Sequence, residues 1–131
     1  MTNLKKIPNF IQFHWDATRF IHQYQEGLKN AAKPYGISLL ETEILLSLTH
    51  CPTCDSITKL CSTIGKTKGV ISKACEKLRQ TGYISGKIDE GDRRVVHYQL
   101  NAASRTVVIA VVRHIETMTE ASFFPGENIS Y

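Results

Sequence analysis

The 131-residue sequence predicts a mainly α-helical domain that carries one small β-hairpin. Three observations between residues 55 and 100 predict this class. Two amphipathic helical stretches lie on either side of a break at Gly65-Lys66. Two β-like runs follow, residues 83–88 and 94–100, and the charged turn DEGDR joins them. A short helix pair followed by a hairpin with arginines at its tip is the plan of a winged helix-turn-helix.

We expect a first helix over about residues 8–32, because Pro8 suits a first helical turn and Pro34 and Gly36 break the chain afterwards. Its apolar residues recur at steps of three and four: Phe10, Phe13, Ala17, Phe20, Tyr24 and Ala31, with Gly27 in the one gap and Leu28 beside it. Such a long stripe predicts a partner helix, for example from a second copy of the chain. The alternative is that the stripe packs only on its own domain.

The second helix should cover residues 39–50, because Ser38 and Glu41 have the spacing of a capping box. Its apolar face should belong to the core and consists of Leu40, Ile44, Leu45 and Leu48. A turn over residues 51–54 then leads into the third helix, which Asp55 or Ser56 can cap.

The third and fourth helices form the predicted helix-turn-helix. The third should bury Ile57, Leu60, Cys61 and Ile64, and the fourth, the recognition helix over 67–80, should bury Val70, Ile71, Ala74, Cys75 and Leu78. Thr67 can cap the recognition helix, and Gly82 should end it. Gly69 lies in its first turn, where a missing side chain suits either a close approach to DNA or steric relief against the preceding helix.

The opposite, outer face of the recognition helix is polar and basic. It consists of Lys66, Lys68, Ser72, Lys73, Lys77 and Gln80. The net charge of the chain is only +4, but residues 56–100 hold nine Lys and Arg against four Asp and Glu, whereas the remaining residues hold seven against eight. All the excess positive charge therefore lies in the stretch that the pattern marks for nucleic-acid binding. The alternative is a solvated basic face without a partner.

A last helix should run from residue 102 to about 122, and Asn101 can cap it. Val108, Val111, Ile115 and Met118 lie on one face, which Val107, Val112 and Phe123 widen. We expect one domain over 1–131, in which dimerisation helices at about 8–32 and 102–123 flank a DNA-binding lobe at about 38–100. Val108, Val111 and Ile115 should be buried between two copies. The remaining residues leave no room for a further full helix.

The wing sequence DEGDRRVVHYQLN resembles the signature of the MarR family of transcriptional regulators. The matching residues are Asp92, Arg94, Val95, Leu100 and Asn101, with Asn where the family usually has Thr. The resemblance extends over about residues 36–105 and implies that Asp92 pairs with Arg94 to hold the shape of the wing. It also implies a dimer, whose interface in this family usually includes a further C-terminal helix.

The sequence thus predicts a dimeric, sequence-specific DNA-binding regulator, most simply a repressor, and leaves control by a small molecule or by redox chemistry open. We expect Ser72 and Lys73 to reach base edges. Lys66, Lys68 and Lys77 should hold phosphates, with Thr67 beside them, while Arg93 and Arg94 enter the minor groove. The alternative is a winged helix that binds protein, which would not need a basic outer face.

Motifs for other functions are missing from the sequence. It has no Gly-rich phosphate loop, no HExxH and no nucleophile elbow, and its five histidines are scattered, so we predict no enzyme, catalytic residue, cofactor or metal site. No apolar run approaches the ~20 residues of a membrane span, and no signal peptide is recognisable. We therefore expect a cytoplasmic protein.

Cys51 and Cys54 have CxxC spacing, which can form a reversible disulfide or give two thiolates to zinc. A structural zinc site needs a second pair of ligands, and the sequence offers only His50 nearby. Ordinary turn residues, a redox pair and a metal site all stay open for this motif. Cys61 and Cys75 should be buried on their helices.

Overall fold

The computed structural model describes the backbone of residues 4–123 and the side chains of residues 4–117. Its helices are α1 (Ile7–Ala32), α2 (Leu39–His50), α3 (Ile57–Ile64), α4 (Lys68–Gln80) and α5 (Ala102–Phe123), and its strands are β1 (Ile84–Ile88) and β2 (Val96–Leu100). Short 3-10 turns, Leu4–Lys6 and Lys33–Tyr35, lie before and after α1. The predicted fold class is confirmed. None of the described helices is long and apolar enough to span a bilayer.

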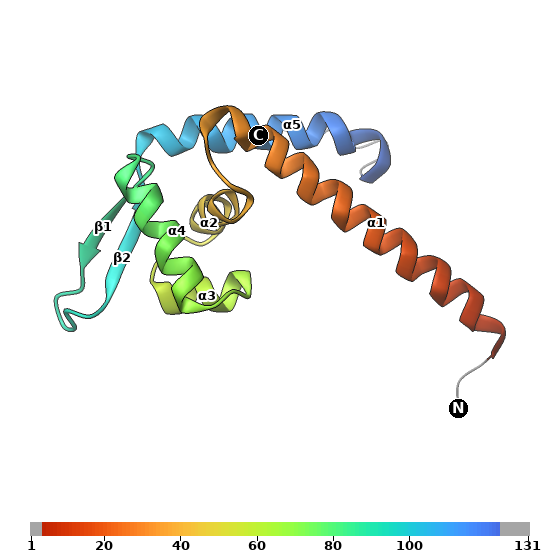
Figure 1. The fold of residues 1–131 in the computed structure, drawn as a ribbon, viewed down its shortest axis with the longest axis horizontal. Helices are drawn as coiled ribbons and strands as arrows, with labels where there is room; N and C mark the ends of the chain where they lie inside the picture. Colours follow the sequence, from red (N-terminus) through yellow and green to blue (C-terminus); the bar gives the residue numbers. More distant parts are fainter. Residues whose placement is uncertain (1–3, 124–131) are drawn as a thin grey trace.

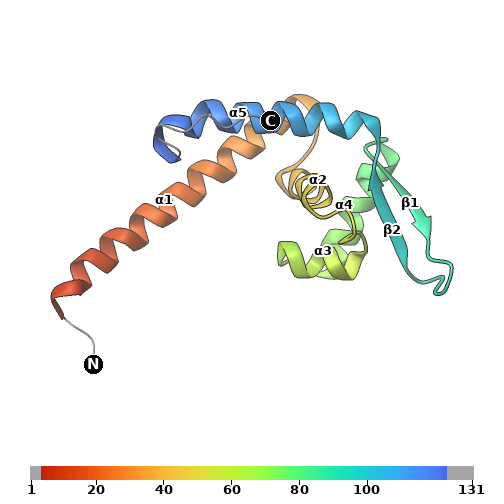
Figure 2. The same ribbon diagram turned by 180° about the vertical axis from the view of Figure 1, so that it is seen from behind.

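Helices α1 and α5 form an arch, and α2, α3, α4 and the β-hairpin form a lobe beneath it (Figure 1). Figure 1 shows α5 across the top of the molecule, with α2, α3 and α4 below it and the β-hairpin at the far end. The end of α1 contacts α5 and α2, whereas its beginning runs away from the rest of the chain. Figure 2, the view from behind, shows α2 in the middle, below α5 and beside α4.

The core is built around α2, as its apolar face predicts. Ile44 and Leu45 are completely buried, and Leu48 is nearly so. Around them pack side chains from every other helix and from the hairpin: Leu28, Ala32, Leu60, Ile71, Cys75, Leu78, Ile84, Tyr98, Val107 and Val111. Burial of this apolar surface is the main force that holds the lobe on α1 and α5.

The predicted capping box is confirmed. The N–H of Ser38 donates to Glu41 Oε1 at 2.8 Å, and the N–H of Glu41 donates to Ser38 Oγ at 3.2 Å. Ser56 caps α3 by accepting from the N–H of Lys59 at 3.3 Å, whereas Asp55 points elsewhere. These bonds satisfy backbone donors that a helix start leaves free.

The predicted cap of α5 is wrong. The side chain of Asn101 instead donates to the carbonyl oxygen of Gly82 at 3.0 Å and accepts from the hydroxyl of Ser85. Its own N–H donates to the carbonyl oxygen of Tyr83 at 3.0 Å. Asn101 therefore ties the base of the hairpin to the end of α4.

The prediction for α5 holds only in part. Val111 is 1% exposed within the single chain, and so is Val107, because both pack into the core against α1 and α2. Val111 is thus unavailable to a second copy, contrary to our expectation. Val108 and Ile115 are half-buried at the edge of the core. Met118 and Phe123 lie outside the side chains that the structure describes, and the chain after residue 123 lies outside the described residues.

The apolar stripe of α1 divides into two parts. Gly27, Leu28, Ala31 and Ala32 are buried against the rest of the chain. Towards the start of the helix, Phe10 and Phe13 are each 67% exposed. Among the described residues these two rings therefore stay largely uncovered, which contradicts the alternative that the whole stripe packs only on its own domain.

Candidate nucleic-acid interface

The turn between α3 and α4 depends on Gly65. This residue has φ of +80°, a left-handed conformation that glycine adopts without steric cost, and its N–H donates to the carbonyl oxygen of Cys61 at 2.8 Å. The turn leaves Lys66 and Thr67 exposed in front of α4. Thr67 occupies the N-cap position, as predicted, but its hydroxyl makes no capping hydrogen bond.

The rotation of α4 about its axis is fixed by its buried face. Ile71, Cys75 and Leu78 are completely buried, and Ala74 is nearly so. The residues expected to touch DNA from this helix and its turn are consequently all exposed: Lys66, Thr67, Lys68, Ser72, Lys73 and Lys77. Val70 corrects the predicted pattern. It is 46% exposed and lies on the outer side of α4 instead of in the core.

A shallow groove of about 710 Å³ runs along the outer face of α4 and reaches the start of α2. Its lining includes the predicted base-reading residues Ser72 and Lys73, together with Val70 and Gly69. An ideal Cβ added to Gly69 would meet nothing within 4 Å. Steric relief against the preceding helix is therefore the wrong explanation for this glycine. The close approach of DNA to this turn stays a prediction.

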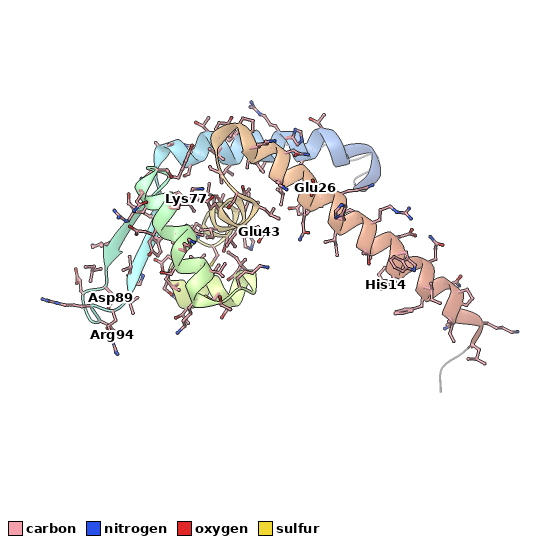
Figure 3. The ribbon with its side chains drawn as sticks, viewed as in Figure 1. His14, Glu26, Glu43, Lys77, Asp89 and Arg94 are labelled. Atoms are coloured by element: carbon pink, nitrogen blue, oxygen red, sulfur yellow. The ribbon has the colours of Figure 1, made fainter. Side chains whose placement is uncertain are left out.

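Lys77 has a partner within the chain. Its Nζ lies 3.5 Å from Oε1 of Glu41, whose side chain is only 4% exposed. The same oxygen accepts the N–H of Ser38 in the capping box. Lys77 was expected to hold a phosphate, but this contact turns it towards the start of α2. Figure 3 shows Lys77 on α4 well away from Asp89 and Arg94 at the tip of the hairpin.

Gly82 sets the direction in which the hairpin leaves α4. Its φ is +86°, and the N–H of Tyr83 donates to the carbonyl oxygen of Leu78 at 2.9 Å, while the N–H of Gly82 donates to that of Arg79 at 3.1 Å. This is the Schellman pattern, so the predicted helix stop is confirmed. β1 and β2 then pair antiparallel, with Ile84 opposite Leu100 and Ile88 opposite Val96.

The tip of the hairpin is held by two aspartates. Asp89 Oδ2 accepts the N–H groups of Gly91 at 2.9 Å and Asp92 at 2.8 Å. Asp92 Oδ1 in turn accepts from the N–H of Arg94 at 3.0 Å and from its Nε at 3.2 Å. The structure thus contains the ion pair that the resemblance implies. Arg93 and Arg94 are exposed, so both can reach a partner.

His97 lies between two carboxylates, a contact that the sequence did not suggest. Its Nδ1 is 3.0 Å from Asp55 Oδ1, and its Nε2 is 2.7 Å from Asp89 Oδ1. The bond with Asp55 and then the bond with Asp89 raise the pKa of His97. The bond with His97, followed by the N–H groups of Asp92 and Gly91, lowers the pKa of Asp89. No spacing in the sequence signals this triad, because the fold of the hairpin brings it together.

Cys51 and Cys54 are free, partly exposed thiols in the turn between α2 and α3. The proximity of the two side chains lowers the pKa of Cys51, which also contacts the hydroxyl of Thr53, and raises the pKa of Cys54. Cys75 is fully buried, and burial raises its pKa to about 12. Cys61 is only half-buried. Within the part of the chain that is described, no group of three or more His, Cys, Asp or Glu could hold a metal ion.

No protein-family model matches the chain, and no curated protein matches it significantly in sequence. Solved structures do resemble it. A MarR family transcription regulator superposes with a TM-score of 0.78 at 16% identity, over 95% of this chain and 81% of that one. The regulator BldR from Sulfolobus solfataricus superposes with a TM-score of 0.72 at 21% identity, over 95% of this chain and 88% of that one.

A third similar structure contains nucleic acid. A MepR variant from S. aureus, bound to an oligodeoxyribonucleotide, superposes with a TM-score of 0.68 at 14% identity, over 83% of this chain and 80% of that one. At such identities the likeness establishes the fold, which is the winged-helix fold of MarR-family regulators.

Proposed function

We propose that this chain is a sequence-specific DNA-binding transcriptional regulator that acts as a homodimer, most simply as a repressor. The observation that carries the proposal is the polar and basic outer face of α4, exposed beside the arginines of the wing on a MarR-type fold. A winged helix that binds protein would not need this face. The DNA-bound MepR variant supports the same use of the fold.

The recognition helix α4 enters the major groove with its first two turns. Ser72 and Lys73 reach base edges there, and exposed Val70 adds an apolar contact of the kind that recognises the methyl group of thymine. Lys66 and Lys68, with the hydroxyl of Thr67, hold phosphates at the start of the helix, where the helix dipole also favours negative charge. Gly69 allows the backbone of this first turn to approach DNA closely.

The wing enters the adjacent minor groove. Arg93 and Arg94 stand at its tip, and narrow A·T-rich minor grooves attract arginine. The carboxylate of Asp92 accepts from the backbone N–H and from the Nε of Arg94. These two bonds fix both the turn and the direction of the guanidinium. We assign Lys77 to holding α4 on α2 through Glu41 instead of to a phosphate, because Glu41 is a buried partner.

A second copy of the chain covers the first half of α1. Its exposed apolar residues include Phe10, Phe13, Trp15 and Ile21, each more than half exposed. Such an exposed apolar patch marks an interaction surface. A symmetric dimer would place two recognition helices about one DNA turn, ~10 bp, apart on a pseudo-palindrome.

Control by oxidation has one supporting observation. Cys51 and Cys54 are free thiols in the same turn, and the neighbouring side chain of Cys54 lowers the pKa of Cys51. Hydrogen peroxide would take two electrons and two protons from the pair of thiols, so that one disulfide and two waters form. Mass spectrometry after peroxide treatment tests this, with loss of two hydrogens expected for the native chain and absent from Cys51→Ser. A pair that stays reduced removes this form of control.

Selection from a pool of random DNA duplexes tests the main proposal. The native chain should enrich a short inverted repeat. The matched control is the triple variant Lys66→Ala, Lys68→Ala and Lys73→Ala, which changes only exposed side chains and should enrich none. Failure of the folded native chain to enrich any sequence would contradict sequence-specific binding.

A further inference from the structure

The imidazole of His97 connects two parts of the interface that are separate in the chain. Asp55 directly precedes the cap of α3 and so belongs to the helix-turn-helix, whereas Asp89 begins the loop at the tip of the hairpin. The ring nitrogens of His97, on β2, lie 3.0 Å and 2.7 Å from their respective carboxylates.

Backbone bonds hold both aspartates beside β2 independently of the ring. The carbonyl oxygen of Asp55 accepts the N–H of Tyr98 at 2.9 Å, which fixes the residue beside β2. The N–H of Asp89 donates to the carbonyl oxygen of Val95 at 2.9 Å, and its second carboxylate oxygen holds the turn. Both carboxylates therefore lie within reach of the ring, and the charge of the ring decides how strongly they hold it.

Only the protonated ring satisfies this arrangement. An imidazolium donates from both nitrogens, one to each carboxylate, whereas a neutral ring donates from one nitrogen and turns the lone pair of the other towards a negative oxygen. Lys87 on β1 is the cross-strand partner of His97 and is the further charged residue beside it. The ammonium of Lys87 disfavours a positive charge on the ring of His97. Because Lys87 is exposed to solvent whereas the two carboxylates lie at hydrogen-bonding distance, the carboxylates dominate.

We propose that His97 is a positioning residue that, as an imidazolium, fastens the wing to the helix-turn-helix and so makes the placement of the wing depend on pH. The chain of contacts runs from Asp55 through His97 to Asp89, whose other oxygen orders Gly91 and Asp92. Asp92 then holds Arg94. The consequence for DNA binding rests on the proposed function, because it requires that the wing touch DNA.

The direction of the pH effect follows from the raised pKa of His97. The contribution of the imidazolium is complete below the ordinary histidine pKa of about 6.5. It is lost as the pH rises through the raised value. DNA affinity should therefore decline over the neutral to mildly alkaline range, while the carboxylate of Asp89 stays ionised because its pKa is lowered.

The first measurement needs no DNA. An NMR titration of the imidazole signals of the full chain, assigned with His97→Gln, should place the midpoint of His97 above about 6.5. Backbone order parameters of residues 90–94 should fall as the ring loses its proton. The matched control His50→Gln changes an exposed histidine outside this triad and should leave both results unchanged. A His97 midpoint at or below the ordinary value, or a wing whose order does not follow it, overturns the proposal.

The second measurement follows affinity for the selected duplex against pH at constant salt. The native chain should lose roughly tenfold in affinity as His97 deprotonates, a typical effect of one charge-assisted hydrogen bond. His97→Gln should bind weakly at every pH, and His97→Arg, which stays charged, should bind tightly without the pH dependence. If His97→Gln keeps the pH dependence of the native chain, the proposal is overturned. If no duplex binds at any pH, the proposed function fails, and the NMR titration still decides the role of His97.

Discussion

Arg94 donates twice to one oxygen of Asp92, through its backbone N–H at 3.0 Å and through its Nε at 3.2 Å. The first bond shapes the turn and the second orients the guanidinium, so a single carboxylate oxygen sets both the backbone and the side chain of the wing tip. Arg93, its neighbour, is exposed too. The two arginines should therefore differ in their importance for DNA binding.

Arg94→Ala should weaken DNA binding by roughly tenfold or more, because it removes a groove contact and frees Asp92. Arg93→Ala should weaken it less, since only a groove contact is lost. The DNA affinity of Asp92→Asn should lie between those of the native chain and Arg94→Ala, because the amide oxygen still accepts a hydrogen bond but carries no charge. Fluorescence anisotropy with the selected duplex measures all three. An Arg94→Ala chain that binds like the native one would remove the wing from the mechanism.

Lys73 and Lys66 should separate base reading from phosphate binding. Lys73→Ala should relax the preference at one position of each half-site, because a base contact carries sequence information. Lys66→Ala should weaken all sequences equally and lower the salt slope by about one per contact. Binding to a panel of single-base variants at several salt concentrations distinguishes them.

Lys77→Ala serves as the comparison in that experiment. Because Lys77 faces Glu41, its loss should leave both the sequence preference and the salt slope unchanged. Equal changes of specificity in Lys73→Ala and Lys66→Ala would mean that α4 is docked in another register. A lower salt slope for Lys77→Ala would return this lysine to the phosphate contacts.

Gly69→Ala should have opposite effects on stability and on binding. It should stabilise the free chain by up to about 0.5–1 kcal/mol, because alanine favours the helix and its Cβ meets no neighbour. It should weaken DNA binding, since the methyl group occupies space that the first turn of α4 leaves for DNA. Denaturant unfolding and anisotropy measure the two effects. Unchanged DNA affinity would show that DNA does not approach this turn closely.

Phe13→Ala should shift the chain from dimer to monomer. Phe13 is 67% exposed in the single chain, so its truncation should scarcely affect folding of one copy. If a second copy buries it, removal of the ring costs about 3 kcal/mol and weakens association roughly a hundredfold. Light scattering over a dilution series detects the shift, with Gln23→Ala on the same helix as the control. A native chain that is monomeric at micromolar concentration contradicts the dimer.

Local signals in the sequence were enough to predict most of the fold. The capping box of Ser38 and Glu41, the glycines at 65 and 82 and the alternation of the hairpin each act within a few residues, and helix and strand bounds follow from them. Val70 and Asn101 were misplaced for the opposite reason. Their environments depend on how α4 and the hairpin pack, which three- and four-residue periodicity does not encode.

The candidate site was predictable only where its residues are close in sequence. The outer face of α4 and the pair of Asp92 and Arg94 lie within single elements. The contact of Lys77 with Glu41 joins α4 to α2. The bridge through His97 reaches Asp55, which is 42 positions away in the sequence. Such contacts depend on tertiary packing, so a scattered histidine and a surface lysine gave no sign of them.

The salt dependence of DNA binding tests the central claim most directly. The positive charges of Lys66, Lys68 and Arg93 from each of two protomers would neutralise phosphate charge, Arg93 from within the minor groove. Each neutralised phosphate adds about 0.9 to the slope of log affinity against log salt. The account predicts a slope of magnitude above about 4 for the selected duplex. A flat titration, or no binding to any duplex at low salt, would contradict it.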